Sequence, residues 1–280
     1  TGFVSEQKLV FFHGIGANGK STLLNIMARI LGGYAMSLPF ASLIQDDFKR
    51  GSEPSPDLAR LPAVRMVRAS EAEKGSRFSE ATIKMMTGGE EMTVRHLNRD
   101  FFDFAPVFKL VLSGNHRPTI RGQDHGIWRR LMLVPFLVTI TKPDKRLDDD
   151  LWAERAGILN WMLDGTRMWL ETGLDPPPEV CQATDEYRSD SDRLGQFLNS
   201  WTVSTDGVRV QARALYDAYV LWCAENADEP VSMTLFGRML VERGLAKEKV
   251  GVMFYVGLEL TDEAAAALSR KKSRGKEPDE

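Results

Sequence analysis

Short apolar runs separated by helix-like segments dominate the first half of the chain. Apolar and β-branched residues concentrate in four runs, which predict buried strands: Leu9–Phe12, Leu61–Ser70, Phe108–Ser113 and Leu131–Phe136. Helices are predicted over Leu23–Leu31 and over Ser79–Thr87, the second with Ser79 as its N-cap and Gly88-Gly89 at its end. Charged residues mix with Gly and Pro from Asp46 to Pro56, which predicts a surface connection.

A β-hairpin is predicted from Glu91–Leu97 and Phe101–Phe104, with Asn98-Arg99-Asp100 as its turn. Three side chains make its tip cationic: Arg95, His96 and Arg99. Such residues suit contact with a phosphate backbone, and they also suit a charged hairpin that faces water. Charge alone favours the second interpretation.

Helical patterns dominate the second half of the chain. Apolar residues from Leu147 to Thr172 recur at spacings that predict an amphipathic helix, which Gly173 ends. The prolines of Asp175–Pro178 mark a boundary, and Glu179–Asp192 predicts a charged, moderately amphipathic helix. Beyond Glu263 the sequence is rich in Ala and then in Lys, Arg and Glu, which predicts a frayed or disordered tail.

Three helices and a hairpin are predicted between Arg193 and Asp262, and this order is that of a winged helix. The predicted elements are Leu194–Trp201, Ala212–Glu225, a helix from an N-cap at Ser232 to Arg243, and a wing over Lys249–Leu260. The third helix carries few cations, so DNA binding and a packing role both remain open. Four aromatic residues are expected in the core of this unit rather than on a base-stacking surface: Phe197, Tyr216, Tyr219 and Trp222.

The stretch from His13 to Thr22 has the spacing of a phosphate-binding loop, G-x-x-x-x-G-K-[ST], between a predicted strand and a predicted helix. Lys20 would reach the β- and γ-phosphates of a nucleotide, Ser21 would ligate magnesium, and the helix N-terminus would face the anion. The residues expected to bind the nucleotide are Gly14, Gly16, Asn18, Gly19, Lys20, Ser21 and Thr22. The alternative is a glycine-rich turn without a ligand.

Polar residues follow two further predicted strands. Phosphoryl transfer needs an acidic group beside the loop, and Glu71 is the first candidate and Glu73 the second, for catalysis and for magnesium. Solvated acids leaving a strand are the alternative. Asn115 is positioned to orient the hydrolytic water or to sense the γ-phosphate, although Asn is also common before a turn that contains Pro.

Two adjacent arginines, Arg129 and Arg130, precede the strand predicted over Leu131–Phe136. A guanidinium supplied by a neighbouring subunit stabilises the transition state of phosphoryl transfer, an effect of about 10³ to 10⁵ in rate. Surface ion pairing is the alternative role for both residues.

Composition narrows the class of protein. The 280 residues are 43% hydrophobic, and no apolar stretch approaches the ~20 residues that a membrane-spanning helix needs. The two cysteines have neither disulfide-framework nor zinc-site spacing, which favours a reducing cytoplasm. A formal net charge of −3 excludes a chain that coats nucleic acid by charge alone, so any such contact is local. Because the chain opens on Thr1 and a strand follows almost at once, we expect a piece of a longer protein.

The motifs, taken in order, resemble helicase superfamily III. They are the loop with Asn18, the strand end Ala69-Ser70-Glu71, the cationic hairpin, Ser113-Gly-Asn-His-Arg-Pro118, and Ile127-Trp-Arg-Arg-Leu131. More narrowly, residues 1–140 are similar to the helicase region of phage and plasmid primases of the satellite-phage and poxvirus-primase type. One departure is Ser70, where many members of the family have a second acidic residue, so how Glu71 and Glu73 divide their roles stays open.

This resemblance implies an α/β fold of AAA+ type with a central parallel sheet (1–140), a helical connecting segment (141–192), a winged-helix domain (193–262) and the tail (263–280). It also implies a homo-hexameric ring that hydrolyses ATP with Mg²⁺ between subunits. The catalytic residues would be Lys20, Glu71, Asn115 and either Arg129 or Arg130. The residues that contact DNA in the channel would be Arg95, His96, Asn98 and Arg99.

An ATP-driven DNA helicase of phage or mobile-element replication is therefore the leading functional hypothesis. It would act in the cytoplasm of a bacterial host on single-stranded or forked DNA, with primase or other replication proteins as partners. An ATP-switched DNA-binding or assembly module is the alternative. A small-molecule kinase is disfavoured, because the sequence has a hairpin and a long C-terminal region and no evident arginine-rich lid.

Overall fold

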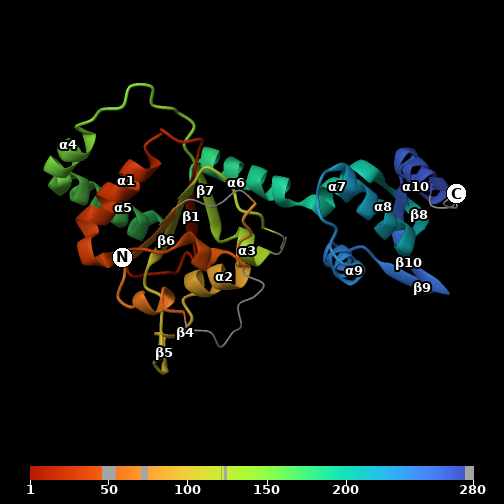
Figure 1. The fold of residues 1–280 in the computed structure, drawn as a ribbon, viewed down its shortest axis with the longest axis horizontal. Coiled ribbons are helices and arrows are strands. Elements are labelled where there is room, and N and C mark those ends of the chain that lie inside the picture. The colour runs from red at the N-terminus through yellow and green to blue at the C-terminus, as the bar shows by residue number, and fades with distance from the viewer. Residues whose placement is uncertain (46–54, 71–74, 121, 123–124, 275–280) are drawn as a thin grey trace, which may run out of the picture. The chain divides into compact units, whose positions relative to one another are not determined.

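The computed structural model describes residues 1–280 except 46–54, 71–74, 121, 123–124 and 275–280 (Figure 1). The chain forms two compact units, Thr1–Ser191 and Asp192–Glu280. The segment predicted as a separate connection, 141–192, therefore packs with the first unit up to Ser191. Among the described residues, no helix combines the length and the apolar character needed to cross a bilayer.

A five-stranded parallel sheet forms the centre of the first unit, as expected for the α/β fold. Its strands are β1 (Leu9–His13), β2 (Ala35–Ser37), β3 (Met66–Ser70), β6 (Lys109–Gly114) and β7 (Leu131–Pro135), in the order β2-β3-β6-β1-β7. Every neighbouring pair is parallel. The four strands predicted from apolar runs are all present, but β3 begins five residues later than predicted, and the three-residue β2 was not predicted.

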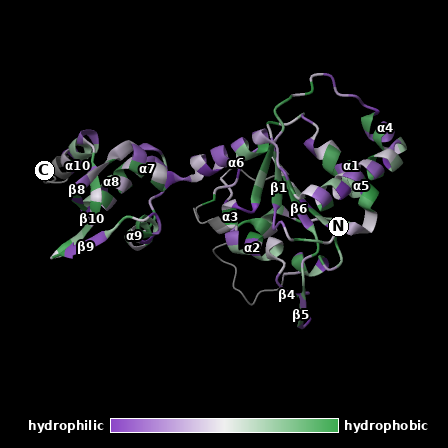
Figure 2. Cartoon of the chain, turned by 180° about the vertical axis from the view of Figure 1, so that it is seen from behind, coloured by the Kyte–Doolittle hydropathy of each residue, from purple (hydrophilic) through white to green (hydrophobic). Residues whose placement is uncertain are grey.

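Helices cover both faces of this sheet, because alternate strand residues point to opposite sides. On one face, α1 (Lys20–Leu31) packs its Leu24 against Met66 and Val111. On the other face, α2 (Glu80–Gly88) and α3 (His125–Trp128) bury Ile83, Met86 and Ile127 with the main apolar cluster. The N-cap predicted at Ser79 is confirmed, since its hydroxyl accepts the N–H of Thr82. Figure 2 shows hydrophobic residues concentrated in the central strands.

Three short 3₁₀ turns connect these elements: Gly32–Tyr34, Phe40–Leu43 and Leu58–Arg60. The predicted hairpin is confirmed as β4 (Met92–Arg95) paired with β5 (Phe101–Phe104). Its inner face carries the buried Met92 and Val94, and its tip is exposed.

The predicted amphipathic helix 147–172 is two helices, α4 (Leu147–Ala153) and α5 (Arg155–Thr172), which meet at Glu154. All of α5 is described, and it has no buried residue. Its apolar side chains instead remain exposed in this chain, among them Leu159, Trp161, Leu163, Met168 and Leu170. The helix α6 (Pro178–Ser191) then packs beside the edge strand β7, with Val180 and Tyr187 buried.

The second unit has the element order helix, strand, helix, helix, strand, strand, helix. These are α7 (Arg193–Trp201), β8 (Thr202–Gln211), α8 (Ala212–Glu225), α9 (Met233–Glu242), β9 (Lys247–Val250), β10 (Val252–Leu260) and α10 (Asp262–Arg274). The antiparallel sheet has the order β8-β10-β9, and β8 was not predicted. The tail expected at 263–280 is instead helical as far as Arg274, because Ala264 and Leu268 are buried in the core of this unit.

The aromatic residues expected in the core of the second unit are found there. Phe197 is fully buried, and its ring lies 5.4 Å from the ring of Tyr219 and 6.1 Å from that of Trp222. Tyr216 is partly buried, with its ring 5.4 Å from that of Phe236. These rings therefore hold the unit together and are not a surface for stacking bases.

Replacing Phe197 by Ala should lower the free energy of unfolding of the second unit by about 3–5 kcal/mol, because the truncation leaves a cavity among packed rings. Urea denaturation followed by tryptophan fluorescence measures the loss. Val203→Ala, at a position that is 48% exposed in the same unit, is the control and should cost under about 0.5 kcal/mol. Equal losses for the two variants would contradict the assignment of this core.

Candidate functional site

The candidate site lies at the carboxyl ends of the strands of the parallel sheet. In the sheet order β2-β3-β6-β1-β7, the chain after β1 crosses toward the β2 side, whereas the chain after β6 crosses toward the β7 side. Two adjacent strands whose following connections run in opposite directions form a topological switch point, where open α/β sheets bind ligands. The loop after β1 and Asn115 after β6 meet there, since His13 pairs in register with Gly114.

The loop between β1 and α1 is built around positions that tolerate no ordinary side chain. A Cβ on Gly14 would lie 2.2 Å from the carbonyl oxygen of Phe136. Gly19, the N-cap of α1, has a φ of 86°, in the left-handed region that favours glycine. The segment after β7 closes the loop from outside, with the Ile140 amide donating to the Ala17 carbonyl at 2.7 Å. The predicted glycines therefore fix the shape of the loop.

Lys20 holds three parts of the site together. Its side chain is buried, and its Nζ donates to the Gly14 carbonyl at 2.7 Å, to Asn18 Oδ1 at 2.8 Å and to Asn115 Oδ1 at 3.4 Å. Burial lowers the pKa of this ammonium, which means that its charge is incompletely compensated. A ligand that brings negative charge would supply the missing compensation.

The N-terminus of α1 carries no competing group. Gly19 offers no side-chain cap, and the first turn contains no acidic residue. The first hydrogen bond of the helix runs from the Leu23 amide to the Gly19 carbonyl. The amides of the first turn that come before Leu23 therefore have no acceptor within α1. Ser21 is exposed and Thr22 is half-buried in this turn. Together with the Lys20 ammonium, these groups form an arrangement suited to phosphate oxygens.

The acidic half of the site is only partly described. Glu71 and Glu73, the predicted acids, lie outside the described residues. Ser70, the last residue of β3, is described, and the Ser113 hydroxyl donates to its hydroxyl at 3.1 Å. The end of β3 is therefore beside the end of β6, at the same edge as Asn115. Within the described part of the chain, no group of three or more His, Cys, Asp or Glu residues could hold a metal ion.

Asn115 faces the loop between β1 and α1. In addition to the Lys20 contact, its Nδ2 lies 4.0 Å from where a Cβ on Gly16 would stand. Asn18 completes the arrangement by donating its Nδ2 to the Phe136 carbonyl at 3.0 Å while its Oδ1 accepts from Lys20. Two amide side chains, from different loops, therefore orient the same ammonium.

His13, at the end of β1, is a site residue that the sequence analysis missed. Burial lowers its pKa first, and the positive charges of Arg117 and Lys20 lower it further. The imidazole is accordingly neutral near pH 7. A polar residue at the end of an apolar strand, directly before the glycine loop, was the signal that could have identified it.

The two candidate arginines occupy different environments. Arg130 is buried, and its guanidinium donates to the Gly126 carbonyl and to Gln7 Oε1 at 3.2 Å. Arg129 is exposed, and its backbone carbonyl accepts Lys8 Nζ at 2.7 Å. Both precede Leu131, which pairs with Leu9 at the amino end of β1. They are thus separated from the loop by the length of β1, about 13 Å at ~3.3 Å per residue.

The predicted DNA-contacting residues all lie at the hairpin tip. Arg95 is half-buried, with its guanidinium 4.9 Å from the Phe101 ring, and His96 stacks on Phe102 at 5.6 Å. Asn98 turns the chain with a φ of 56°, a conformation that Asn adopts more readily than most residues. Arg99 is exposed at the turn. The tip therefore presents Asn98 and Arg99 to solvent, whereas Arg95 and His96 pack on aromatic rings.

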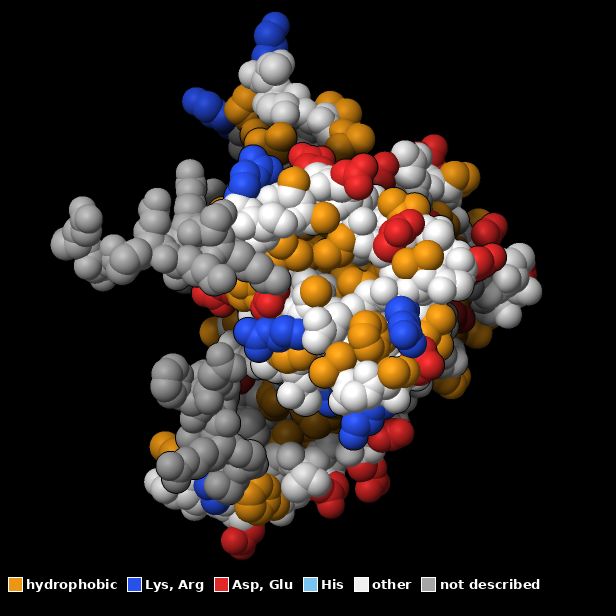
Figure 3. All heavy atoms as spheres, turned by 90° about the vertical axis from the view of Figure 1, so that its right-hand side faces the viewer, with side chains coloured by type: hydrophobic (Ala, Val, Ile, Leu, Met, Phe, Trp, Pro, Cys, Tyr) orange, Lys and Arg blue, Asp and Glu red, His pale blue; other side chains and the backbone are white. Residues whose placement is uncertain are grey.

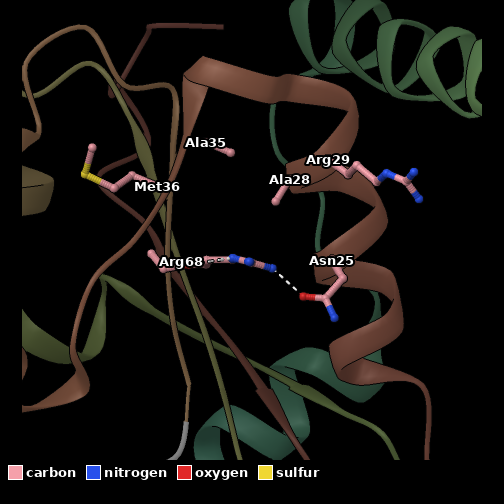
Figure 4. Close-up of a pocket in the computed structure, with 7 residues that line it drawn as sticks. Asn25, Ala28, Arg29, Ala35, Met36 and Arg68 are labelled. Atoms are coloured by element: carbon pink, nitrogen blue, oxygen red, sulfur yellow. Dashed lines mark hydrogen bonds between the residues drawn. The ribbon is translucent and has the colours of Figure 1, made fainter. Parts of the chain in front are cut away.

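A cavity of about 310 Å³ lies beside α1, between that helix and strands β2 and β3. In Figure 4, Arg68 reaches across it to Asn25, to which it donates a hydrogen bond, whereas Arg29 points away. Arg68 also donates to the Ser37 hydroxyl at 2.9 Å.

Figure 3 shows a face on which basic, acidic and apolar side chains are interspersed. Among the described residues of that face, the picture shows no broad basic surface.

Part of the chain matches a known family model. Residues 12–130, from the end of β1 to Arg130, match the "Family of unknown function (DUF5906)". The matched range contains the loop, the hairpin, Asn115 and both arginines.

Curated relatives of this chain are viral proteins. It is 28% identical over 247 residues to "Putative helicase L207/L206" of Acanthamoeba polyphaga mimivirus, covering 81% of this chain and 26% of that protein. It is 25% identical over 244 residues to "Putative helicase 022R" of Frog virus 3, covering 79% and 25%. A shorter match, 27% over 128 residues, is to "Putative primase C962R" of African swine fever virus, covering 46% and 13%.

The chain thus spans about a quarter of the length of the first two relatives. Among solved structures, the C-terminal region of NrS-1 in an apo form aligns with a TM-score of 0.49 and 12% identity, covering 79% of this chain and 47% of that one. The two curated relatives that cover about four fifths of this chain are viral proteins with helicase names.

Proposed function

We propose that this chain is the ATPase part of a DNA helicase that serves replication of a virus, phage or other mobile element. The observation that carries the proposal is the convergence of the Gly14–Thr22 loop, the buried Lys20 ammonium and Asn115 at one switch point of the sheet. The helicase names of the viral relatives support it. In this proposal the ligand is ATP with Mg²⁺.

The β- and γ-phosphate oxygens of ATP would replace the protein oxygens that Lys20 now contacts. Amides of the first turn of α1 would donate to the same phosphates, where the helix dipole also favours negative charge. The Ser21 hydroxyl, exposed in that turn, is the described side chain best suited to ligate Mg²⁺. Glu71 remains our candidate for activating the attacking water, with Glu73 as the second.

Asn115 is the candidate for orienting the hydrolytic water or reading the γ-phosphate. Its amide oxygen is 3.4 Å from Lys20 Nζ, so its side chain already lies near the position that a terminal phosphate would take. Breaking the β–γ bond would change what the amide contacts. Its role therefore includes reporting which nucleotide is bound.

If Arg129 or Arg130 stabilises the transition state, it does so in the ATP site of another copy of the chain. Arg129 and Arg130 lie at the amino ends of the strands, whereas Lys20 lies beyond their carboxyl ends, so neither arginine reaches the loop of its own chain. Because Arg130 is committed to intrachain hydrogen bonds, we assign the trans role to Arg129. A closed ring, which we propose to be a homo-hexamer, would place this residue in every ATP site.

DNA contact is assigned to the hairpin tip. Asn98 and Arg99 are exposed there, and several tips converging on a channel would concentrate positive charge that a single mildly acidic chain lacks. The strand contacted would be single-stranded DNA or one strand of a fork. Phosphate contacts of this kind release counterions, so affinity should fall steeply with salt.

A second candidate function comes from the C-terminal unit. We interpret its order of helix, strand, two helices and a β9–β10 hairpin as a winged helix, a fold that binds either DNA or protein. In this alternative, ATP would switch a DNA-binding or assembly module without processive unwinding. Stimulation of steady-state ATP hydrolysis by single-stranded DNA separates the two, because it is expected only of the translocase.

Lys20→Ala should abolish ATP hydrolysis, since the variant has no ammonium to reach the terminal phosphates. Steady-state phosphate release measures the effect, and we expect a decrease of at least about 10³-fold. The control is Lys249→Ala, which removes an exposed ammonium from β9 in the second unit. Activity retained in Lys20→Ala would exclude this loop as the hydrolytic site.

Arg129→Ala and Arg130→Ala should have different consequences. Arg129→Ala should lower ATP hydrolysis by about 10³-fold or more and leave the melting temperature unchanged. Arg130→Ala should lower the free energy of unfolding by about 1–3 kcal/mol, because buried hydrogen-bond acceptors are left without their donor. Hydrolysis assays and thermal unfolding of both variants measure this, and the reverse pattern would sink the assignment.

Arg99→Ala should weaken binding of single-stranded DNA and reduce the slope of log K against log salt by about 0.7 for each phosphate that is no longer neutralised. Fluorescence anisotropy at several salt concentrations gives the slope. Asp103→Asn, which changes the charge of the same hairpin away from its tip, is the control. An unchanged slope in Arg99→Ala would exclude this side chain from phosphate contact.

A further inference from the structure

The helix α6 contacts the loop that carries Asn115. Tyr187 of α6 is 2% exposed, and its hydroxyl donates to the Pro118 carbonyl. The Trp128 ring packs edge-on against the Tyr187 ring at 5.4 Å. From the other side, the Arg117 guanidinium lies 5.3 Å from the Tyr187 ring and pairs with Asp190 at 2.8 Å. Two consecutive residues of the loop are thus fixed by one helix.

These contacts lie close to the catalytic amide along the chain. Pro118 follows Asn115 by three positions along the chain, which limits the distance between their Cα atoms to about 10 Å even in extended chain. Asn115 is exposed; its backbone hydrogen-bonds to His13, and its side chain contacts Lys20 at 3.4 Å. Its position on the other side depends on how the following residues are held, and Tyr187 and Asp190 hold them.

A second set of α6 contacts serves a different purpose. Thr184 Oγ1 accepts the Leu133 amide of β7 at 3.0 Å, and Val180 is buried nearby in the same helix. Covering β7 protects an exposed sheet edge from pairing with other chains. Edge protection explains these contacts, but it does not require a hydroxyl and an ion pair directed at the loop after β6.

The phenol of Tyr187 is suited to a permanent contact. Burial raises its pKa well above the usual range, so that the hydroxyl stays protonated and remains a donor at all working pH values. The acceptor is the carbonyl of Pro118, a residue whose ring fixes its φ. The contact therefore joins a rigid loop residue to a buried helix residue 69 positions away.

We propose that Tyr187 and Asp190 of α6 are positioning residues for ATP hydrolysis, acting through Arg117 and Pro118 to set the place of Asn115. This inference rests on the proposed ATPase function. Neither residue would touch the nucleotide, so ATP binding, which depends on Lys20 and the loop, is unaffected. Only the step that needs Asn115 in place responds.

The test compares Tyr187→Phe with Thr184→Val, each of which removes one hydroxyl from α6. Tyr187→Phe should lower kcat for ATP hydrolysis about five- to tenfold with KM for ATP within about twofold, as expected for loss of one oriented hydrogen bond. Thr184→Val should leave kcat within about twofold of wild type. Melting temperatures of both variants show whether any loss of activity follows unfolding.

The decisive measurement repeats Tyr187→Phe in an Asn115→Ala background, by single-turnover hydrolysis with enzyme in excess. A residue that acts through Asn115 should have no further effect once that amide is absent. Asp190→Asn should behave like Tyr187→Phe in both backgrounds, with a smaller decrease because its ion pair is exposed.

The outcomes are separable. Absence of hydrolysis by the wild-type protein would contradict the proposed function itself. Hydrolysis by wild type, with equal losses in Tyr187→Phe and Thr184→Val or with an undiminished Tyr187→Phe effect in the Asn115→Ala background, would overturn the positioning role and leave the ATPase proposal standing. Loss confined to Tyr187→Phe and Asp190→Asn, and absent without Asn115, would support it.

Discussion

The buried ammonium of Lys20 is the interaction on which the candidate site depends. It donates to one backbone carbonyl and two amide side chains, which belong to the loop after β1 and the loop after β6. Those loops meet because the sheet order places β6 beside β1. Burial lowers the pKa of this ammonium, and a buried positive charge of this kind is suited to a phosphate ligand. The fold brings the groups together, and the charge determines what they bind.

The same sheet also separates groups. Its parallel strands gather the loops at their carboxyl ends and leave Arg129 at the amino end, on the far side of β1 from Lys20. In the proposed ATPase, each chain would contribute Lys20 to one ATP site and Arg129 to another. Our proposal of a ring follows from that separation. The helix α6, the last helix of the first unit, contacts the loop that carries Asn115 through Tyr187.

Local signals predicted much of this structure. The glycine loop, the four longer strands, the hairpin and the cap at Ser79 have strong short-range signatures, and each was found, although β3 begins five residues later than predicted. The three-residue β2 has too few residues to show a pattern. The α10 helix was missed because its stability comes from burying Ala264 and Leu268 on a core that the sequence pattern does not reveal. Choosing between Arg129 and Arg130, and finding the contact from Tyr187 to Pro118, needed the register of distant strands and helices.

Mixing two inactive variants tests the central claim, that each ATP site combines Lys20 of one chain with Arg129 of the next. Lys20→Ala and Arg129→Ala proteins would be combined in equal amounts, and ATP hydrolysis would be measured with the mass of the assemblies. Random mixing leaves both residues intact at about a quarter of the interfaces, so hydrolysis should return to about that fraction of wild type. Mixed assemblies of the expected mass with no recovery of hydrolysis would contradict the account.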